Sequence, residues 1–209
     1  MHGSRFAAQK KLIFATEREL ERVQELRREW RASVCPALRG RRVFFLDESG
    51  VTTALTRLYG RAPGGARAVG SAPKNYAAQI NILAAISRTG VAASLALTGS
   101  VNGAVMRVFV RDVLRPVLQV GDVVVLDNFA VHKTKAVQAE FRAAGVEVYY
   151  LPPYSPDLNP IELCWSKVKT LLCSVEARTH EKLYKEIGTA LGKVTASDAK
   201  GWIKHCGYG

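Results

Sequence analysis

The sequence contains no long apolar run. Its longest apolar stretches, such as residues 82–86 and 123–126, fall far short of the roughly 20 residues that a membrane-spanning helix needs. No charged segment followed by an apolar stretch and a cleavage site is found near the first residue, so nothing predicts secretion. We therefore expect a cytoplasmic protein without a membrane partner.

Cysteine is also scarce. None of the four cysteines lies in a CxxC pair: Cys35, Cys164, Cys173 and Cys206. They are too few for a disulfide scaffold in a chain of 209 residues, and their spacing is not that of a structural zinc site. We expect them to be reduced thiols.

Acidic residues are outnumbered by basic ones. The chain has 30 Lys and Arg against 18 Asp and Glu, a net charge of +12, which favours a polyanionic partner through phosphate contacts. Residues 1–42 carry half of this surplus. We expect residues 1–41 to form a basic helical arm or linker in front of one globular domain over residues 42–209.

The arm is predicted to contain one helix, over residues 16–32. Thr16 and Glu19 have the spacing of a capping box, and Cys35-Pro36 is expected to end the helix. One narrow apolar stripe would dock it on the domain: Leu20, Val23 and Trp30.

Strand signals follow the arm. Four segments before residue 100 are rich in strand formers and bounded by turn signals, namely residues 43–46, 52–59, 79–87 and 91–97. The basic, glycine-rich residues 60–67 have the composition of an exposed loop. A further strand over residues 123–126 is apolar on both faces, which predicts a central position in the sheet.

The rest of the chain alternates helices with one more strand. The expected order is a helix capped by Asn102, a second helix, a short strand and a proline-rich turn, over residues 103–114, 133–144, 147–151 and 152–160. Asn159 is expected to cap a third helix, in which Pro160 takes the first position. Two short helices complete the chain.

Three carboxylates lie where α/β folds place their sites. Asp47 and Asp127 each follow a predicted strand, and Glu162 lies near the start of a helix. Open α/β sheets bind ligands at the carboxyl ends of their strands. If the two strands are neighbours, the aspartates repel each other unless a cation lies between them. Mg²⁺ suits such oxygen ligands, and two ions can activate a nucleophile and stabilise a leaving oxygen, so the acids and the positive charge together predict phosphodiester chemistry on nucleic acid.

Each of these acids taken alone is better explained as a turn former or a helix cap. Their joint arrangement is more specific. Asp127 and Glu162 are separated by 34 residues, and they lie in the segments Leu-Asp-Asn and Pro-Pro-Tyr-Ser-Pro-Asp-Leu-Asn-Pro-Ile-Glu.

Residues 42–209 resemble the DDE transposases of the mariner superfamily, in particular the bacterial insertion sequence 630 group. Three segments carry the resemblance: Phe-Leu-Asp-Glu-Ser-Gly at 45–50, Val-Leu-Asp-Asn with the following His132-Lys133 at 125–133, and Leu-Pro-Pro-Tyr-Ser-Pro-Asp-Leu-Asn-Pro-Ile-Glu at 151–162. The third segment is the most diagnostic, and the 34-residue spacing is that of the family.

The resemblance implies a fold, a cofactor and a set of site residues. The fold is α/β and RNase H-like, as in retroviral integrases, with a mixed five-stranded sheet flanked by helices. Asp47, Asp127 and Glu162 correspond to the catalytic, metal-binding triad, which implies Mg²⁺, or Mn²⁺ in its place, with two ions. Asn128 and His132 lie where the family keeps polar residues beside the triad. The implied partner is DNA, both element ends and target.

The sequence departs from the family at its amino terminus. Full-length relatives have helix-turn-helix domains there, and this sequence shows only the helix at 16–32. A split-frame product, a decayed fragment and a trimmed catalytic domain all fit, acting as a homodimer or with a separate helix-turn-helix subunit near the bacterial nucleoid. Target-site preference and present activity stay open.

Several residues near the triad have a structural alternative. Glu48 would point to the opposite side of the strand from Asp47 and so lie behind the metal ligands. His132 could position a water or a phosphate, or cap a helix. Asp157 is expected to stabilise the proline-rich turn, and Trp165 to pack in the core.

Basic residues are candidate phosphate contacts, although most Lys and Arg side chains are simply solvated. Lys169 is the strongest candidate because it shares a helix face with Glu162. The full set is Arg57, Arg61, Lys74, Lys133, Lys167 and Lys169.

Three functions fit these residues. The first is a transposase catalytic domain that cleaves DNA and joins the freed end to a target. The second is an RNase H-like nuclease or resolvase that only cuts. The third is a non-catalytic DNA-binding regulatory fragment, which the intact triad disfavours. A recombinase with Tyr149 or Tyr150 as nucleophile is weakly supported, because no Arg and His cluster surrounds them in the sequence.

Overall fold

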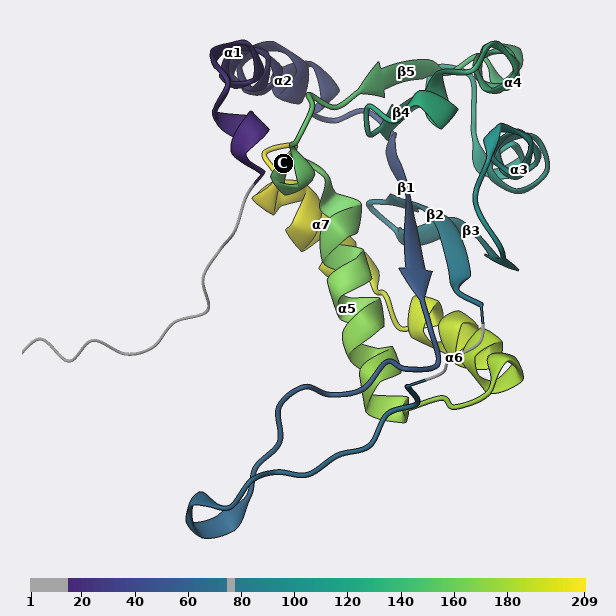
Figure 1. Ribbon diagram of the computed structural model, residues 1–209. Helices are drawn as coiled ribbons and strands as arrows, with labels where there is room; N and C mark the ends of the chain where they lie inside the picture. The colour runs from purple at the N-terminus through teal and green to yellow at the C-terminus, as the bar shows by residue number, and fades with distance from the viewer. Residues whose placement is uncertain (1–14, 75–77) are drawn as a thin grey trace, which may run out of the picture.

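The computed structural model describes residues 15–74 and 78–209, so the first 14 residues of the predicted arm lie outside the described part. Five strands form one mixed sheet in the order β3-β2-β1-β4-β5 (Figure 1), with bounds β1 Val43–Val51, β2 Ile80–Ser87, β3 Gly90–Thr98, β4 Val123–Leu126 and β5 Glu147–Tyr150. The central strand β1 pairs antiparallel with β2 and parallel with β4. The expected mixed five-stranded sheet is confirmed.

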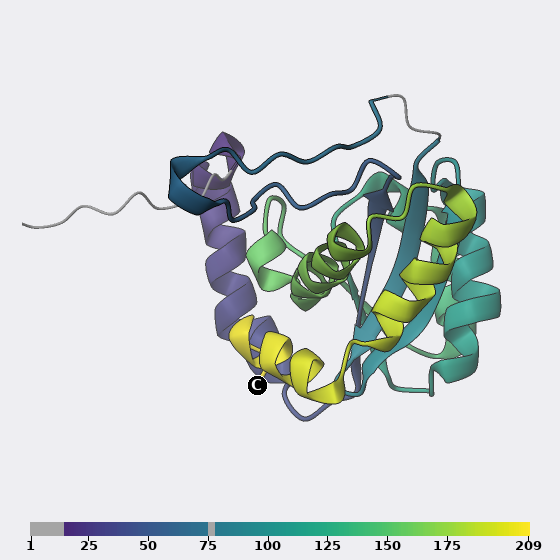
Figure 2. The same cartoon turned by 90° about the horizontal axis from the view of Figure 1, so that it is seen from below.

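Helices cover both faces of the sheet (Figure 2). One face packs against α5 (Pro160–Val175), α6 (His180–Gly192) and α7 (Ala196–His205), and the other against α3 (Gly103–Val108) and α4 (Lys135–Ala144). Successive residues of β1 supply the two cores in turn, as the period of a strand requires. Shorter helical turns lie at Pro63–Gly65, Phe109–Leu114, Arg115–Val117, Ala130–Lys133 and Pro156–Leu158.

Strand β1 is longer than predicted. The expected strand stopped at Leu46, whereas β1 continues to Val51, so Asp47 lies inside the strand and not at its end. The antiparallel neighbour is the reason: β4 ends opposite Leu46, but β2 stays paired with β1 as far as Val51. Backbone hydrogen bonds to β2 therefore outweigh the turn-like composition of residues 47–50.

The expected strand over residues 52–59 is wrong. After β1 the chain forms a long loop, and within its described residues 52–74 and 78–79 no strand is present. Leu58 and Tyr59 are 87% and 85% exposed, so these strand-forming side chains have no second layer to pack against. The predicted exposed loop at residues 60–67 is present, and it extends away from the sheet in Figure 1.

The predicted N-terminal helix is present with different ends. A 3₁₀ turn at Thr16–Glu19 has no side-chain cap, so the expected capping box is wrong; the helix runs through α1 (Glu21–Glu29), a wider π turn (Trp30–Val34) and α2 (Cys35–Leu38). Pro36 does not end the helix, because it lies in the first turn of α2, where its missing N–H is tolerated.

Several side chains of the segment over residues 15–41, which is predicted to be an arm or linker, pack in the hydrophobic core. Val23, Trp30 and Leu38 are buried, while Leu20 of the expected stripe is nearly half exposed. Figure 2 shows this helix lying beside the C-terminal helix α7.

Most of the remaining boundaries agree with the expectation within a few residues. Asn102 caps α3, since its Oδ1 accepts hydrogen bonds from the N–H groups of Ala104 and Val105 at 3.0 Å. Asn159 occupies the N-cap position of α5 and Pro160 its first turn, as expected, but the Asn159 side chain makes no capping hydrogen bond. None of the helices in the described part of the chain is long and apolar enough to cross a membrane.

Candidate active site

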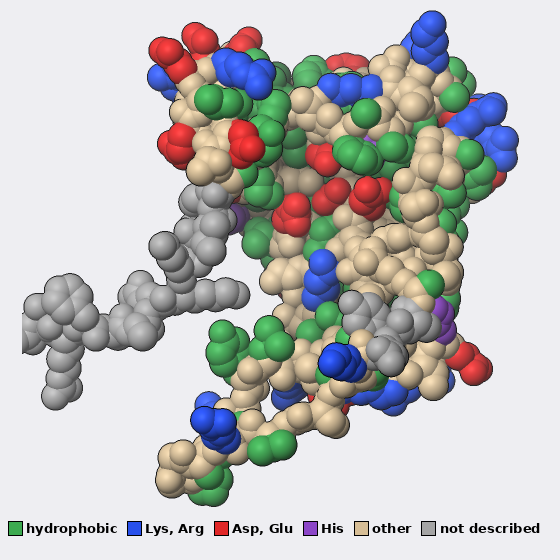
Figure 3. Space-filling model, in the orientation of Figure 1, with side chains coloured by type: hydrophobic (Ala, Val, Ile, Leu, Met, Phe, Trp, Pro, Cys, Tyr) green, Lys and Arg blue, Asp and Glu red, His purple; other side chains and the backbone are tan. Residues whose placement is uncertain are grey.

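The three predicted acids line one cavity of about 560 Å³ at the carboxyl end of β4. Asp47 comes from β1, Asp127 directly follows β4, and Glu162 lies in the first turn of α5. Leu46 and Leu126 are register partners in parallel strands, which brings the aspartates that follow them to the same place. Acidic side chains gather at the centre of the face shown in Figure 3, with Lys and Arg side chains above and below them.

Asp47 is the most buried of the three acids. It is 7% exposed, and Trp165 of α5 donates its Nε1–H to Asp47 Oδ2 at 3.2 Å. Burial, together with the nearby carboxylates of Glu162 and Asp127, raises the pKa of Asp47 to about 7. Trp165 is buried as expected, but its role in orienting Asp47 was not predicted.

Asp127 is held by one of its two oxygens. Oδ1 accepts a hydrogen bond from the Phe129 N–H at 3.0 Å. It also lies 2.7 Å from His132 Nδ1, which makes an ion pair, but the angle of this contact is not that of a hydrogen bond. Burial works to raise the pKa of Asp127, but His132 outweighs it and keeps the pKa below its usual range. Among the described residues Oδ2 has no hydrogen-bond partner, which leaves it available to a ligand.

His132 and Glu48 lie behind Asp127. Glu48 is on the opposite side of β1 from Asp47, as expected from the strand period. His132 Nε2 and Glu48 Oε2 are both buried without a hydrogen-bond partner among the residues described. Burial raises the pKa of Glu48, although the charge of His132 acts in the opposite direction. Burial lowers the pKa of His132, but the contact with Asp127 outweighs burial, so the pKa of His132 lies above its usual value.

Glu162 stands across the cavity with Lys169 close by. Burial raises the pKa of Glu162, and the charge of Lys169, two helical turns further along α5, acts in the opposite direction. This electrostatic interaction agrees with the expectation that Glu162 and Lys169 share one face of the helix.

The six predicted phosphate contacts lie in different surroundings. Lys133 is next to the cavity, where its ammonium contacts the side-chain oxygen of Asn128. Lys167 faces α7 and forms an ion pair with Asp198 at 2.5 Å, so its charge is already compensated within the protein. The other candidates besides Lys169 are exposed on the long loop after β1: Arg57, Arg61 and Lys74.

Three residues that the sequence did not single out also line the cavity: Arg22 of α1, Phe129 and Tyr154. Phe129 and Tyr154 are 50% and 45% exposed, which is unusual for large aromatic side chains beside a polar site. Tyr154 also has φ +54°, a left-handed conformation that non-glycine residues rarely adopt and that clusters at functional sites. The sequence could have indicated Phe129 and Tyr154, because they lie within the distinctive segments 125–133 and 151–162.

The donor atoms around the cavity suit a hard divalent cation, because carboxylate and amide oxygens are its usual ligands. In addition to the acids, Asn128 lines the cavity, and so does Asn159, whose Oδ1 is buried with no partner in the described structure. Within residues 15–74 and 78–209, no three His, Cys, Asp or Glu side chains are yet close enough together to hold one ion. The residue types around the cavity nevertheless fit the chemistry of such a metal.

A second cavity, of about 420 Å³, lies at the opposite end of the sheet. Arg41, Arg42 and Arg88 line it, and no acid does. Ion pairs with Glu147 and Asp122 already engage the first two. Of these two cavities the first is the better candidate for an active site, because three acids with perturbed pKa values converge on it.

Residues 42–184 match the family described as DDE superfamily endonuclease. The chain belongs to this family. The matched region contains all three acids of the cavity. In a comparison with the curated proteins, none matches the sequence of this DDE endonuclease.

Solved structures of Mos1 transposase share its fold. The Mos1 strand transfer complex matches with a TM-score of 0.77 and 16% identity, over 98% of this chain and 64% of that one. The Mos1 paired-end complex with the left transposon end matches at 0.72 and 19%, over 95% and 63%. The Mos1 catalytic domain matches at 0.56 and 19%, over 92% and 90%.

At these identities the similarity shows the fold, which is the expected RNase H-like fold. The DDE endonuclease chain spans less than two thirds of the transposase chains in the two complexes.

Proposed function

We propose that this chain is the catalytic domain of a transposase, of the bacterial insertion sequence 630 group, that cleaves DNA and transfers the freed strand. The convergence of Asp47, Asp127 and Glu162 on one cavity of a DDE endonuclease carries the proposal. The net charge of +12 supports a DNA substrate near the bacterial nucleoid. The Mos1 structures that share the fold include complexes with transposon ends and with transferred strands, which supports element ends and target DNA as substrates.

The proposed cofactor is Mg²⁺, with Mn²⁺ as a substitute and two ions at the site. Paired-end complexes of Mos1 contain Mn and Mg, and the carboxylates of Asp47, Asp127 and Glu162 are the residues that would hold the ions here. When bound, the ions supply activation of the attacking water or 3′-hydroxyl and stabilisation of the leaving oxygen.

The surrounding residues orient these ligands and bind the DNA backbone. Trp165 holds Asp47 through its indole N–H, and the Phe129 N–H and His132 both engage Asp127 Oδ1, which leaves Oδ2 for a ligand. Lys169 and Lys133, beside the cavity, neutralise phosphates of the bound strand. Outer-shell contacts of this kind are worth about 10- to 100-fold in metal affinity or activity.

A partner subunit is part of the proposal, either a second copy of this chain or a separate helix-turn-helix protein. The exposed loop after β1 supports it, because three large apolar side chains on the described part of this loop are almost fully exposed: Leu58, Tyr59 and Val69. Large apolar side chains left in water favour burial against a partner.

The substitution Asp127→Asn tests the function. The amide keeps the shape of the side chain but removes a charge that holds the ions, so Mg²⁺- or Mn²⁺-dependent cleavage is expected to be abolished while DNA affinity is equal or improved. Asp112→Asn is the matched control, since Asp112 is equally exposed and also paired with a cation, Arg111, but lies away from the cavity. Cleavage by purified Asp127→Asn protein at the wild-type rate contradicts the proposal.

A second measurement separates transposition from cutting alone. A DNA end that is already cleaved and carries a free 3′-hydroxyl is supplied with a target duplex, and the products are resolved by size. Joined strands are expected for a transposase, whereas a nuclease or resolvase yields only shortened strands.

A further inference from the structure

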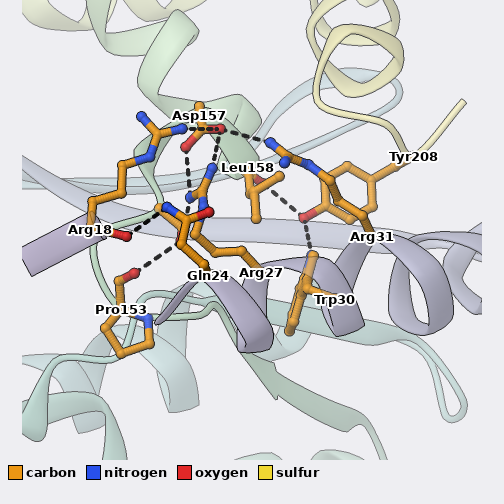
Figure 4. Close-up of polar contacts among 10 residues, drawn as sticks. Arg18, Gln24, Arg27, Trp30, Arg31, Pro153, Asp157, Leu158 and Tyr208 are labelled. Atoms are coloured by element: carbon orange, nitrogen blue, oxygen red, sulfur yellow. Dashed lines mark hydrogen bonds and ion pairs between the residues drawn. The ribbon is translucent and has the colours of Figure 1, made fainter. Parts of the chain in front are cut away.

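The proline-rich turn before Glu162 is held by a helix from the opposite end of the sequence. Arg27 of α1 is only 2% exposed, and it donates hydrogen bonds to Ser155 Oγ at 2.6 Å and to both carboxylate oxygens of Asp157 at 3.0 and 2.7 Å (Figure 4). A bidentate pair of arginine and carboxylate fixes direction as well as distance. The contact therefore sets the orientation of the turn relative to α1.

Two further guanidinium groups reinforce this contact. Arg18 and Arg31 reach Asp157 Oδ2 at 3.2 and 3.0 Å, so three arginines of one helical segment converge on a single carboxylate (Figure 4). A buried arginine has to keep its hydrogen-bonding partners, because an unpaired buried charge is strongly unfavourable. The turn cannot move away from α1 without leaving Arg27 unpaired.

The same helix fixes the turn at a second point. Trp30 donates its Nε1–H to the Tyr208 hydroxyl at 2.9 Å, and this hydroxyl donates to the Leu158 carbonyl at 2.7 Å. Trp30, Tyr208 and Leu158 are all buried. Asp157 is thus tied directly to Arg27 of α1, and Leu158 is tied through Tyr208 to Trp30 in the π turn that follows α1.

The position of Glu162 depends on this turn. The Glu162 N–H donates to the Asn159 carbonyl at 3.1 Å, and the side chain of Asn159 gives α5 no cap. The backbone of the turn therefore determines where α5 begins. Arg22, also on α1, lines the same cavity as Glu162.

We propose that α1 is a positioning element of the active site and that Arg27 is its principal positioning residue. By fixing the turn at Ser155 and Asp157, Arg27 sets the place of Glu162 relative to Asp47 and Asp127. This inference rests on the proposed function, because it requires Glu162 to be a metal ligand.

The test compares Arg27→Lys and Asp157→Asn in the full chain with the control Arg42→Met. Arg42 also pairs with an aspartate, Asp122, but at the opposite end of the sheet. Cleavage is measured over a series of Mg²⁺ and Mn²⁺ concentrations, alongside DNA affinity and thermal stability.

For the Arg27 and Asp157 variants, the Mg²⁺ concentration at half-maximal cleavage is expected to rise about 10- to 100-fold, as for other outer-shell contacts. The KM for DNA should stay within about twofold, because the phosphate contacts are unchanged. Mn²⁺ should restore more activity than Mg²⁺, since Mg²⁺ demands a more regular geometry. Arg42→Met should leave the metal dependence unchanged even where it lowers thermal stability.

Unchanged metal dependence in the Arg27 and Asp157 variants, with activity lost only in proportion to the unfolded fraction, overturns the positioning role. If Arg27→Lys does not fold, Asp157→Asn and Ser155→Ala decide the question. Glu162→Gln in the same assay separates the two claims. A Glu162→Gln protein that cleaves normally refutes the proposed function. If Glu162→Gln is inactive while the Arg27 and Asp157 variants keep the normal metal dependence, only this inference is refuted.

Discussion

At the scale of single residues, Asp47 has unfavourable surroundings. Its carboxyl group is buried beside Glu162 and Asp127, and its hydrogen-bond partner Trp165 is neutral. With a pKa raised from 3.8 to about 7, the folded protein keeps a proton that the unfolded chain loses. The free energy of unfolding therefore falls as the pH rises from about 4 to 7, by as much as about 4 kcal/mol.

We predict that Asp47→Asn stabilises the metal-free protein above pH 7. The amide carries no charge and can still accept the Trp165 hydrogen bond, so the loss of stability between pH 4 and 7 should largely disappear. Urea unfolding in EDTA at pH 5 and pH 8 measures it. Asp112→Asn serves as control, because Asp112 is exposed and its pKa is lowered by Arg111. Identical pH profiles for the wild type and Asp47→Asn would show that burial of this charge is not costly.

Tyr154 is the second residue whose surroundings call for a functional test. We predict that Tyr154→Ala weakens binding of DNA with an unpaired end by about 5- to 150-fold, since stacking of one base on an aromatic ring contributes about 1–3 kcal/mol. Tyr154→Phe keeps the ring and should bind normally. Fluorescence anisotropy with frayed and fully paired duplexes provides the measurement, and equal affinities for the Ala and Phe variants would exclude stacking.

The sequence predicts the three acids that line the cavity but not the residues that orient them. Asp47, Asp127 and Glu162 stand out because each lies in a short, distinctive segment. The partners Trp165 and Arg27 are ordinary core or surface residue types, separated from the acids they contact by 118 and 130 positions. Nothing local in the chain encodes such pairs, since they exist only once the sheet and helices are packed.

At the scale of elements, the expectations are correct where local composition is enough to form the element, and wrong where the element depends on pairing with a distant strand. The strand at residues 123–126 is apolar on every residue, so local composition was enough to predict it. The extension of β1 over Asp47 to Val51 depends on pairing with β2, while residues 52–59 have strand-like composition but no neighbour to pair with. Strand formation is decided by partners that a local pattern does not specify.

Helix α1 provides the prediction at this scale. Trp30 is buried and hydrogen bonded to Tyr208, so Trp30→Ala should lower the free energy of unfolding by about 3–5 kcal/mol, as for other buried large-to-small substitutions. Arg28→Ala, on the exposed side of the same helix, should change it by less than about 0.5 kcal/mol. Chemical unfolding of both variants decides whether this segment is core or arm, since a peripheral arm would give two equally small effects.

At the scale of the whole molecule, the net charge of +12 predicts DNA binding with strong salt dependence and little sequence preference. Two lysines on α5 test which charges act. Lys169→Ala should reduce the slope of log affinity against log salt by about 0.9, the value for one phosphate contact. Lys167→Ala should leave the slope unchanged, because Asp198 already pairs with Lys167. Equal slopes for both variants contradict the assignment of Lys169.

The hydrogen bond from Tyr208 to the Leu158 carbonyl affects the order in which contacts form during protein synthesis. Synthesis proceeds from the N-terminus, and domains fold as their residues become available. Because Trp30, Leu158 and Tyr208 meet in one buried relay, the turn in front of Glu162 reaches its final support only after Tyr208 has left the ribosome. A nascent chain that already contains Asp47, Asp127 and Glu162 therefore still lacks one of the contacts that hold the turn in front of Glu162.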